Sequence, residues 1–424
     1  MIGIVPATTA YQAWLATYIP VVGPDLVAKH ELMASGVFPF FRGTAYRWAE
    51  RWPIVCVELT DAPSVLGVGD LHVENFGTWR DAEGRLVWGV NDVDETADMP
   101  YTNDLVRLVA SALVAAADAR MTVGTEEAAA AVLAGYTATL GDGGQPFVLA
   151  EHHRILGDLA TAAIKDPERY WTKLQSLPAE SESPAEMTAA ARTALPAGTT
   201  DIRVGHRMAG VGSLGRPRVV ATGTLCGSTI AREAKAIVPS AWTWAASVRR
   251  HVDPKEPTAP DGTAHRTDPP SRPANVTGSP DATHAAAQTA ADPGPPAAPD
   301  RLGDTSAHAG TMERLLNDAT RARDPYWSVT DRRWIIRRLA PDCSRIELSD
   351  LPSQRDETKL LHAMGEETAN LHLATRGAAT AIARDLSHRP ADWLSRAASA
   401  MVHDVQSDAA AWATSWRQLH QKVE

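Results

Sequence analysis

Six side chains able to bind a metal ion or move a proton stand close together in residues 68–108. They are Asp70, His72, Asn75, Asp92, Asp94 and Asp104. Two short apolar runs, 65–68 and 86–90, predict buried strands with a turn at 81–84. We expect these two strand ends to lie side by side. Each polar residue alone is typical of an ordinary turn, but carboxylates that converge repel one another unless a cation lies among them, so the set predicts a divalent metal site.

A second pattern lies in residues 210–215, which read Gly-Val-Gly-Ser-Leu-Gly, a G-x-G-x-x-G arrangement. Alone it is a weak signal, because flexible hairpin turns carry the same residues. A dinucleotide-binding fold would need a helix that opens at the last glycine. Pro217 and the following residues Arg218-Val219-Val220-Ala221 predict a strand instead, and Lys235 stands on a further extended run at 230–236.

These two patterns together hold the parts that phosphoryl transfer from ATP requires. The parts are a glycine-rich turn over the phosphates, a lysine that neutralises them, oxygen ligands for magnesium and a carboxylate that orients the acceptor hydroxyl. Missing side chains let backbone N–H groups approach phosphates. We therefore predict that Gly210, Gly212, Ser213, Gly215 and Lys235 bind the nucleotide.

The acidic stretch supplies the remaining parts. Asp70 is the predicted base that orients the acceptor, and His72 beside it is assigned to structural support or substrate positioning. Asn75 and Asp92 are the predicted metal ligands, with Asp94 as a second carboxylate. The predicted cofactors are ATP and Mg²⁺, and the expected partner is a small-molecule acceptor that the sequence does not identify.

The segments GDLHVENFG, GVNDVDE and NDLVRL resemble the catalytic loop, the metal loop and the following helix of the aminoglycoside-phosphotransferase-like branch of the protein-kinase superfamily. Asp70, Asn75 and Asp92 match that pattern, as does the pair Asp104-Leu105, whereas Val68 replaces the histidine that the family has before Gly-Asp. The resemblance implies an ATP- and magnesium-dependent enzyme with two lobes.

Further segments resemble an uncharacterised bacterial family that carries the domain-of-unknown-function label 2252. They are FPFFRGTA, GDLHVENFG, NDVDET, GVGSLGRPRVV and IIRRLAP. That family name records no reaction.

The order of the segments differs from that of ordinary kinases, because the catalytic loop precedes the glycine segment. Residues 358–375, TKLLHAMGEETANLHLAT, resemble the helix that normally leads into the catalytic loop. We therefore expect a circular permutation, which chains tolerate where termini meet at the surface. Since one triphosphate must span the site, Gly212 and Lys235 should then lie within about 15 Å of Asp92.

The expected fold class is α+β, a two-lobed, circularly permuted protein-kinase-like fold with a small β-rich lobe and a large helical lobe. Residues 1–60 are predicted to form a helical preface, and 61–196 the catalytic-loop and metal-loop part of the helical lobe. Residues 197–252 and 311–350 are assigned to the β-rich lobe, and 351–424 to further helices. Residues 253–310 are rich in Pro and Ala with almost no large apolar residue, which predicts a disordered insertion.

Composition limits the other function classes. The formal net charge of −10 argues against a general nucleic-acid binder. Only three cysteines occur, which favours a reducing cytoplasm over a disulfide framework. No stretch reads as a signal peptide or as a membrane span, so no membrane partner is expected, and the oligomeric state is not predicted.

The favoured function is a phosphotransferase, and three alternatives stay open. A metal-dependent hydrolase could use Asp70, His72, Asp92 and Asp94 without a nucleotide. A nucleotide-binding module without turnover and a nucleotidyl transferase are the other two. Glu233 shares a strand face with Lys235, but the helix-borne carboxylate that kinases pair with this lysine is not identifiable in the sequence.

Overall fold

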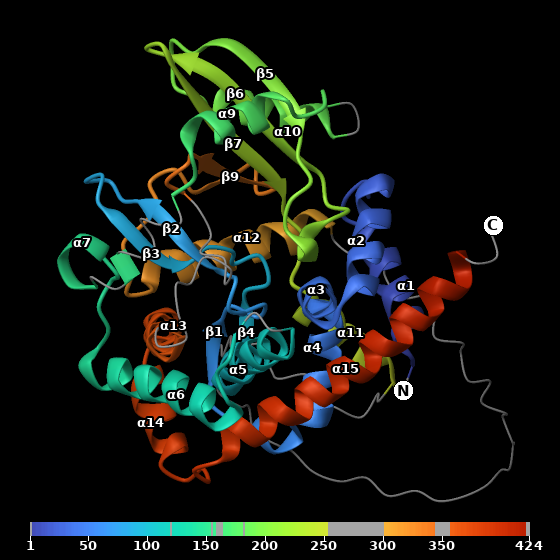
Figure 1. Cartoon of the computed structure of the whole chain (residues 1–424), viewed down its shortest axis with the longest axis vertical. Helices are drawn as coiled ribbons and strands as arrows, with labels where there is room; N and C mark the ends of the chain where they lie inside the picture. The colour runs from blue at the N-terminus through green and yellow to red at the C-terminus, as the bar shows by residue number, and fades with distance from the viewer. Residues whose placement is uncertain are drawn as a thin grey trace, which may run out of the picture.

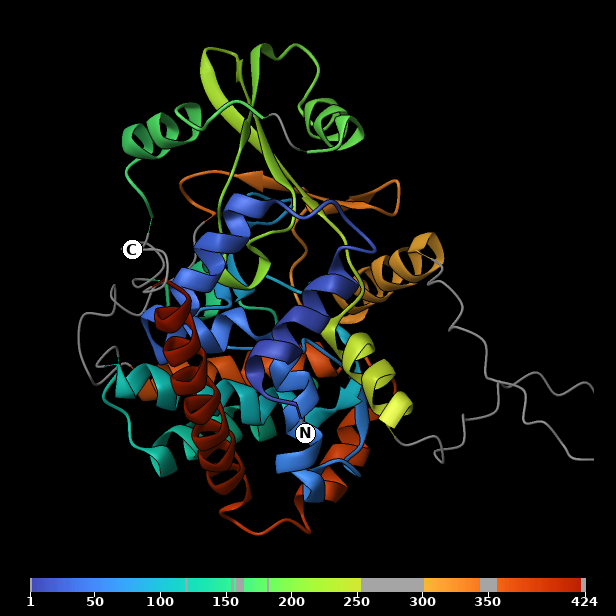
Figure 2. The same cartoon turned by 90° about the vertical axis from the view of Figure 1, so that its right-hand side faces the viewer.

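The protein is described from a computed structural model that covers residues 2–118, 121–153, 156–157, 164–180, 183–252, 301–343 and 357–420. Its mixed α+β architecture confirms the predicted fold class at this level. A five-stranded sheet lies above a larger helical body (Figures 1 and 2). None of the described helices combines the length and the apolar character needed to cross a membrane. The segment 253–300, for which we expect disorder, lies outside the described residues.

The chain begins with four helices, as the sequence predicts for the preface. They are α1 (Ile4–Leu15), α2 (Gly23–Ser35), α3 (Val37–Gly43) and α4 (Ala45–Val55), followed by the short 3-10 helix η1 (Val57–Leu59). Pro24 stands in the first turn of α2, where its missing N–H costs no helical hydrogen bond. Pro24 is therefore compatible with the start of α2.

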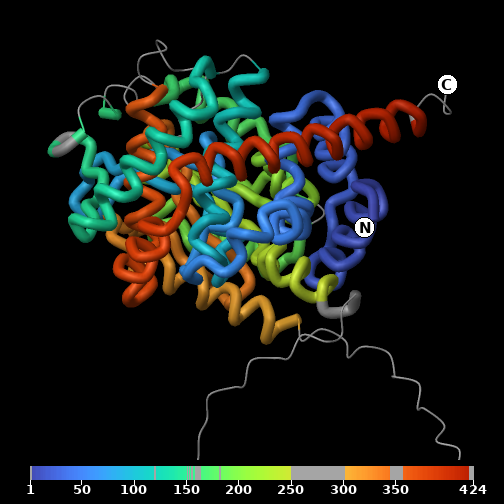
Figure 3. Tube along the Cα trace, turned by 90° about the horizontal axis from the view of Figure 1, so that it is seen from below, coloured from blue at the N-terminus to red at the C-terminus, as the bar shows by residue number. Residues whose placement is uncertain are grey.

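The centre of the helical body is α5 (Tyr101–Ala117), which is buried along almost its whole length. The helices α6 (Thr125–Asp142), α13 (Glu357–His372), α14 (Ala378–Leu386) and α15 (Trp393–His420) complete the body, with the short α7 (Leu149–His152) beside it. Helix α15 runs along one side of the body and contacts both α5 and α2 (Figure 3). The segments before and after the five-stranded sheet thus share one large hydrophobic core.

Two antiparallel strand pairs hold the acidic stretch. The strands are β1 (Ser64–Gly67) with β4 (Ala97–Pro100), and β2 (Phe76–Arg80) with β3 (Leu86–Val90). The two apolar runs, β1 and β3, belong to different pairs and are not hydrogen-bonded to each other. The loops that follow them do come together, as expected, because Asn75 bonds the carbonyl oxygens of both Asp70 and Asp92. The sequence did not reveal the partner strands β2 and β4. Gly77 interrupts the apolar run of β2, and β4, Ala-Asp-Met-Pro, has too little apolar periodicity.

The five-stranded sheet is antiparallel throughout, in the order β5-β6-β7-β9-β8. Its strands are β5 (Thr200–His206), β6 (Arg218–Leu225), β7 (Ser228–Ala236), β8 (Ser328–Thr330) and β9 (Trp334–Leu339). The helices α10 (Ala185–Thr193) and α9 (Pro167–Gln175) lie on opposite sides of the sheet (Figure 2). Consecutive strand residues explain this, because Val219 packs with α10 whereas Val220 packs with α9.

Two further helices follow β7, namely α11 (Ala241–Val252) and α12 (Arg301–Asp318). Helix α12 begins ten residues before the predicted end of the insertion, so that residues 301–310 are helical rather than disordered. Thr305, His308, Met312 and Leu315 are buried at spacings of three and four. Small and polar residues supply the first half of this buried face. The composition of residues 301–310 alone therefore suggests disorder.

Helices α6 and α13 approach closely because glycines stand at their crossing. A Cβ added at Gly135 would lie 2.0 Å from the carbonyl oxygen of His362, and one at Gly365 would lie 2.1 Å from that of Val132. Neither separation is physically attainable, so both positions require glycine. The contact holds α13 against the helical body, and the Tyr136 hydroxyl lies 2.7 Å from His372 Nδ1 near the end of α13.

We expect Gly135→Ala to destabilise the protein by about 1–3 kcal/mol or more, because the added methyl group must push two helix backbones apart. Gly141→Ala is the matched control, since a Cβ at that position of α6 meets nothing within 4 Å. It should leave the free energy of unfolding unchanged or raise it by up to about 1 kcal/mol through helix propensity. Urea titration followed by circular dichroism measures both, and equal stability of the two variants would contradict the packing argument.

Candidate functional site

Asp70 lies in the loop after β1 and is fixed from below by Arg107 of α5. The Arg107 Nε lies 3.0 Å from Asp70 Oδ1, and its Nη2 also contacts that oxygen. The guanidinium carbon lies 4.3 Å from the centre of the Phe41 ring and 4.8 Å from that of Trp48. Cation–π contacts of this kind compensate part of the cost of burying the charge. Asp70 Oδ1 is therefore immobilised, whereas Oδ2 has no hydrogen-bond partner among the residues that the structure describes.

The surroundings of Asp70 also change its acidity. Burial raises the pKa of the carboxyl above its usual value, and the Arg107 guanidinium opposes this shift without cancelling it. A carboxylate with a raised pKa accepts a proton more readily. Asp70 is therefore a fixed, basic carboxylate with one free oxygen.

The Asp104 side chain holds the backbone of the same loop. Its two carboxylate oxygens accept hydrogen bonds from the backbone N–H of Val68 at 2.6 Å and of Gly69 at 2.9 Å. His372 Nε2, from the end of α13, lies 3.1 Å from Asp104 Oδ2. Gly69 adopts φ +80°, and a Cβ there would lie 2.2 Å from the carbonyl oxygen of Glu95. The position of Asp70 thus depends on a buried carboxylate, a glycine and a distant helix.

Asn75 ties the loop of Asp70 to the loop of Asp92. Its Nδ2 donates to the carbonyl oxygens of Asp70 at 3.1 Å and of Asp92 at 2.9 Å. Its Oδ1 accepts from the backbone N–H of Asp92 at 3.0 Å. The structure therefore gives Asn75 a clear role in positioning the two aspartates, while its role as a metal ligand stays a prediction that would use the second lone pair of Oδ1.

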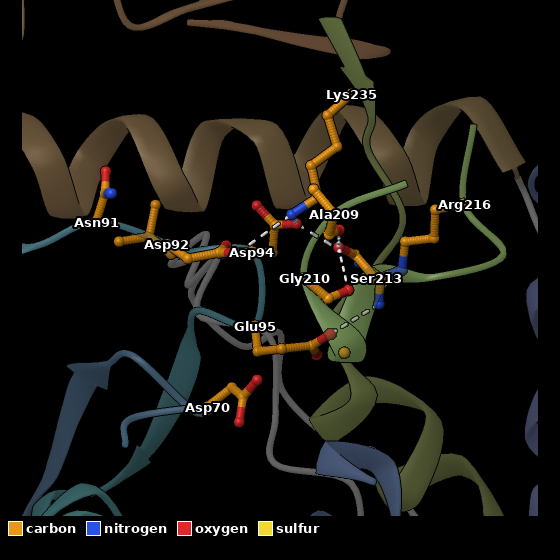
Figure 4. A network of polar contacts seen from close by, with 12 residues as sticks. Asp70, Asn91, Asp92, Asp94, Glu95, Ala209, Gly210, Ser213, Arg216 and Lys235 are labelled. Atoms are coloured by element: carbon orange, nitrogen blue, oxygen red, sulfur yellow. Dashed lines mark hydrogen bonds and ion pairs between the residues drawn. The ribbon is translucent and has the colours of Figure 1, made fainter. Parts of the chain in front are cut away.

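Lys235 of β7 meets both aspartates that follow β3. Its Nζ lies 3.4 Å from Asp92 Oδ2 and forms a closer ion pair with Asp94 Oδ2. The expected proximity of Lys235 to Asp92 is confirmed, although the two residues lie far apart in the sequence. Figure 4 shows Lys235 reaching down from the sheet toward the two carboxylates.

The two aspartates differ in acidity. Burial would raise the pKa of Asp92, but Lys235 and nearby arginines outweigh that effect and hold it well below its usual range. Burial raises the pKa of Asp94 to about 6, and the negative charge of Asp92 adds to the shift. Two adjacent carboxylates with one lysine between them therefore retain an uncompensated repulsion that a further cation would relieve.

The glycine segment lies across the site between β5 and β6, and includes the short 3-10 helix η2 (Val211–Ser213). Gly210 has φ +72°, which favours glycine. A Cβ at Gly212 would lie 3.1 Å from the carbonyl oxygen of Arg42 and 3.6 Å from Asp70 Oδ2, so the segment passes close over Asp70. Ser213 Oγ accepts a hydrogen bond from Arg218 Nη2 at 2.6 Å.

Gly215 has a structural role beside the predicted one. This residue has φ +92°, and its carbonyl oxygen accepts a hydrogen bond from the backbone N–H of Val22 at 2.9 Å. The chain therefore turns toward α2 at this point, and Gly215 does not line the pocket over Asp70. The third glycine of the pattern is a turn residue that attaches the segment to the N-terminal helices.

One pocket collects the other predicted residues. It is lined by Asp70, His72, Asn75, Asp92, Asp94, Gly210, Gly212, Ser213 and Lys235, and also by Lys29, Arg42, Tyr11 and Tyr46 of the N-terminal helices and by Glu95 and Arg216. Several of these residues are drawn in Figure 4. His72 is buried, and its Nδ1 accepts from the backbone N–H of Glu74 at 3.2 Å.

Lys29 and Arg216 belong to the site but carry no motif. Lys29 of α2 is 7% exposed, and its Nζ donates to the carbonyl oxygen of Gly212 at 2.8 Å. Burial, aided by the positive charge of Arg216, lowers the pKa of Lys29 to about 7. The only signal in the sequence is spacing, since Asp25, Lys29 and Met33 recur every four residues and form the buried face of α2.

Arg216 joins the acidic stretch to the N-terminal helices. Its Nη2 lies 2.8 Å from Glu95 Oε1 and 3.2 Å from the hydroxyl of Tyr11, and its Nη1 lies 3.7 Å from Asp94 Oδ2. Glu95 Oε2 also accepts from the backbone N–H of Ala241 at 2.6 Å. Each carboxylate oxygen of Glu95 therefore already has a partner, on Arg216 or on the backbone of Ala241.

The carboxylates of the pocket suit a magnesium ion that also binds water and substrate. They do not suit a metal ion coordinated by protein side chains alone. In the described ranges, no group of three or more His, Cys, Asp or Glu side chains is placed to hold a metal. Magnesium usually binds one or two carboxylates and completes its shell with water and substrate phosphates. Asp92, whose side chain is 38% exposed, and Asp94 provide such a pair.

Glu233 lies on the same face of the sheet but has partners other than Lys235. Its Oε1 contacts Arg207 Nη1 at 2.5 Å and Arg218 Nη1 at 3.4 Å. Burial would raise the pKa of Glu233, but the arginines lower it to about 2. From α12, His308 Nε2 lies 2.8 Å from the carbonyl oxygen of Asp94. In the part of the chain described here, α12 supplies no carboxylate to Lys235.

Comparison with known proteins gives one match. Residues 23–173 match the model of a family described as "Uncharacterized protein conserved in bacteria (DUF2252)". The family label expected from the sequence is therefore supported over α2 to α9, which includes Asp70 and Asp92, but the match does not extend to the five-stranded sheet. No curated protein and no solved structure matches the chain.

We expect Asp104→Asn to destabilise the protein by about 3 kcal/mol, because one of the two loop N–H groups would lose its acceptor and the new amide would face it with a donor. Asp98→Asn is the matched control, since that side chain is 73% exposed and its ion pair with Arg314 is 3.5 Å long. The control should change stability by less than about 0.5 kcal/mol. Thermal and urea unfolding compare the two, and an equal loss in both variants would show that Asp104 does not support the loop.

Proposed function

We propose that the protein is an ATP- and magnesium-dependent phosphotransferase with a circularly permuted, kinase-like fold, which acts on a hydroxyl group of a small molecule. The observation that carries the proposal is the contact of Lys235 with Asp92 and Asp94 beneath the glycine segment. The glycine segment joins the first two strands of the antiparallel sheet, and Lys235 stands on the third. Kinases place their phosphate-binding loop and lysine in the same order on the sheet.

The proposed roles follow from the charges of the site. Asp92 and Asp94 would hold magnesium, which when bound neutralises charge that develops on the phosphates, and Asn75 keeps Asp92 in place through the contacts described above. Lys235 supplies a positive charge at the same point, and the glycine segment offers backbone N–H groups. His72 supports the loop that carries Asp70.

Asp70 is the proposed base for the acceptor hydroxyl. Arg107 fixes Oδ1, which leaves Oδ2 on the side of Gly212 and the pocket. The raised pKa of Asp70 favours transfer of the acceptor proton to it, because a stronger base takes the proton more readily. Lys29, Tyr11 and Tyr46 line the same pocket from the N-terminal helices and so are the residues placed to meet an acceptor.

One contact supports the permutation. The backbone N–H of Leu66 in β1 donates to Thr375 Oγ1 at 2.8 Å, three residues after the end of α13. Helix α13 therefore ends against the strand that leads into the Asp70 loop, although it follows that strand by some three hundred positions in the chain. A connection from Thr375 to β1 would restore the order of segments found in ordinary kinases.

The first test is magnesium-dependent ATP binding by isothermal titration calorimetry. We expect Lys235→Ala and Asp92→Asn each to weaken binding at least about tenfold, since each removes a charge-assisted contact to the phosphates or to their metal. Lys173→Ala and Asp98→Asn are matched controls, because both side chains are exposed and lie outside the pocket. Both controls should bind ATP as the wild type does.

Other outcomes of this titration favour other functions. Wild-type protein that binds Mg²⁺ but not ATP would contradict the proposal and favour a metal-dependent hydrolase. Binding of ATP without transfer to any acceptor in a metabolite screen would favour a nucleotide-binding module. Release of pyrophosphate rather than ADP would identify nucleotidyl transfer.

The second test separates binding from transfer. We expect Asp70→Asn to keep ATP affinity but to lower the transfer rate by about 10²–10⁴-fold, because the amide cannot accept the proton. In the wild type the rate should fall as the pH falls through the pKa of Asp70, and this should occur above the usual pH range of an aspartate because burial raises that pKa. A rate profile at saturating ATP measures both effects, and an unchanged rate in Asp70→Asn would remove Asp70 from the mechanism.

A further inference from the structure

A second cavity, of about 370 Å³, lies behind the Asp92 segment. The β2–β3 hairpin, the end of α12 and the strand β9 enclose it. Its volume is within the range of small-molecule sites, and it has no part in the proposed phosphotransfer. Apolar walls come from Trp79, Val90, Val93, Leu316 and Trp327.

Arg321 brings a buried cation to this cavity. Its Nη2 donates to the carbonyl oxygen of Val90 at 3.0 Å, and its guanidinium carbon lies 4.6 Å from the centre of the Trp79 ring. Its Nη1 is buried and has no hydrogen-bond partner in the described part of the chain. A buried guanidinium N–H without a partner costs free energy, so its presence calls for an acceptor.

Arg337 of β9 provides a second donor at the same cavity. Its Nη2 donates to Asn91 Oδ1, whereas its Nε is buried and has no partner among the described residues. Both unpartnered N–H groups therefore belong to side chains that line one cavity. Two guanidinium donors together suit a carboxylate, sulfonate or phosphate group.

The charges around the cavity do not balance. In the described ranges neither Arg321 nor Arg337 forms an ion pair, and the one carboxylate in the lining, Asp324, accepts from the backbone N–H of Tyr326 at 2.9 Å. Burial lowers the pKa of Arg321, and the attraction of Glu367 and Asp324 offsets only part of that effect. An anion in the cavity would remove the penalty of the unpaired buried charge.

We propose that this cavity binds a planar aromatic molecule with one anionic group, which would place its ring among the apolar walls and its anion beside the guanidinium groups of Arg321 and Arg337. The proposal does not rest on phosphotransfer, since it uses none of the residues assigned to ATP or magnesium. Asn91 and Val93 line the cavity on either side of Asp92. A ligand there would therefore contact the segment that positions the aspartate.

The test uses a matched pair of fluorescent probes, 8-anilinonaphthalene-1-sulfonate and its uncharged analogue N-phenyl-1-naphthylamine. We expect the sulfonate to bind wild-type protein at one site per chain. Arg321→Gln and Arg337→Gln should each weaken it at least about tenfold, while binding of the uncharged analogue changes little. Arg314→Gln is the control, because that arginine of α12 is exposed and lies outside the cavity.

A cavity-filling variant keeps the test valid if an arginine variant fails to fold. Leu316→Trp changes no charge, occupies part of the cavity and should abolish binding of both probes. The proposal is overturned if the sulfonate fails to bind, if Leu316→Trp binds it as the wild type does, or if the arginine variants that fold retain full affinity. Displacement of the probe by ATP and Mg²⁺ would also overturn it, because the cavity would then belong to the nucleotide site.

Discussion

The buried carboxylate of Asp104 is the interaction on which the arrangement of the site depends. It accepts the backbone N–H groups of Val68 and Gly69 from below and meets His372 from the side. Through these contacts one side chain of α5 fixes the start of the Asp70 loop, while Arg107, three residues further along the same helix, fixes the carboxylate of Asp70. A single buried helix thus sets both the backbone and the side chain of the proposed base.

Opposite charges from the loops and from the sheet side meet in the pocket. Lys235 forms ion pairs with Asp92 and Asp94, and Arg216 forms one with Glu95. The two cations come from β7 and from the residues just before β6. The balance is incomplete at Asp94, whose pKa is raised to about 6, chiefly by burial and then by Asp92. Under the proposed function, phosphates and magnesium would bring opposite charges to the same place and would replace the internal ion pairs without leaving a charge unpaired.

Sequence reasoning located those parts of the site whose residues are neighbours in the chain. Asp70 and Asn75 share one loop and Asp92 follows a readable apolar strand, so local pattern was sufficient. Lys29 was missed because it joins the site only through long-range packing, and Arg216, although it directly follows the glycine pattern, was missed because its contact with Glu95 is long-range. The contact of Gly215 with Val22 was missed for the same reason, since it depends on the N-terminal helices. The pairing of β1 with β4 and the early start of α12 were likewise set by tertiary burial rather than by composition.

The order of segments along the chain has a consequence for biosynthesis. Proteins are made from the N-terminus, and domains generally fold in that order as the chain leaves the ribosome. The Asp70 loop and α5 emerge early, whereas His372 and Thr375, which contact Asp104 and β1, emerge only after the whole sheet has been made. The nascent helical body must therefore wait for α13, with part of its apolar surface uncovered, and the site is completed only then even though its proposed base precedes the whole sheet in the chain.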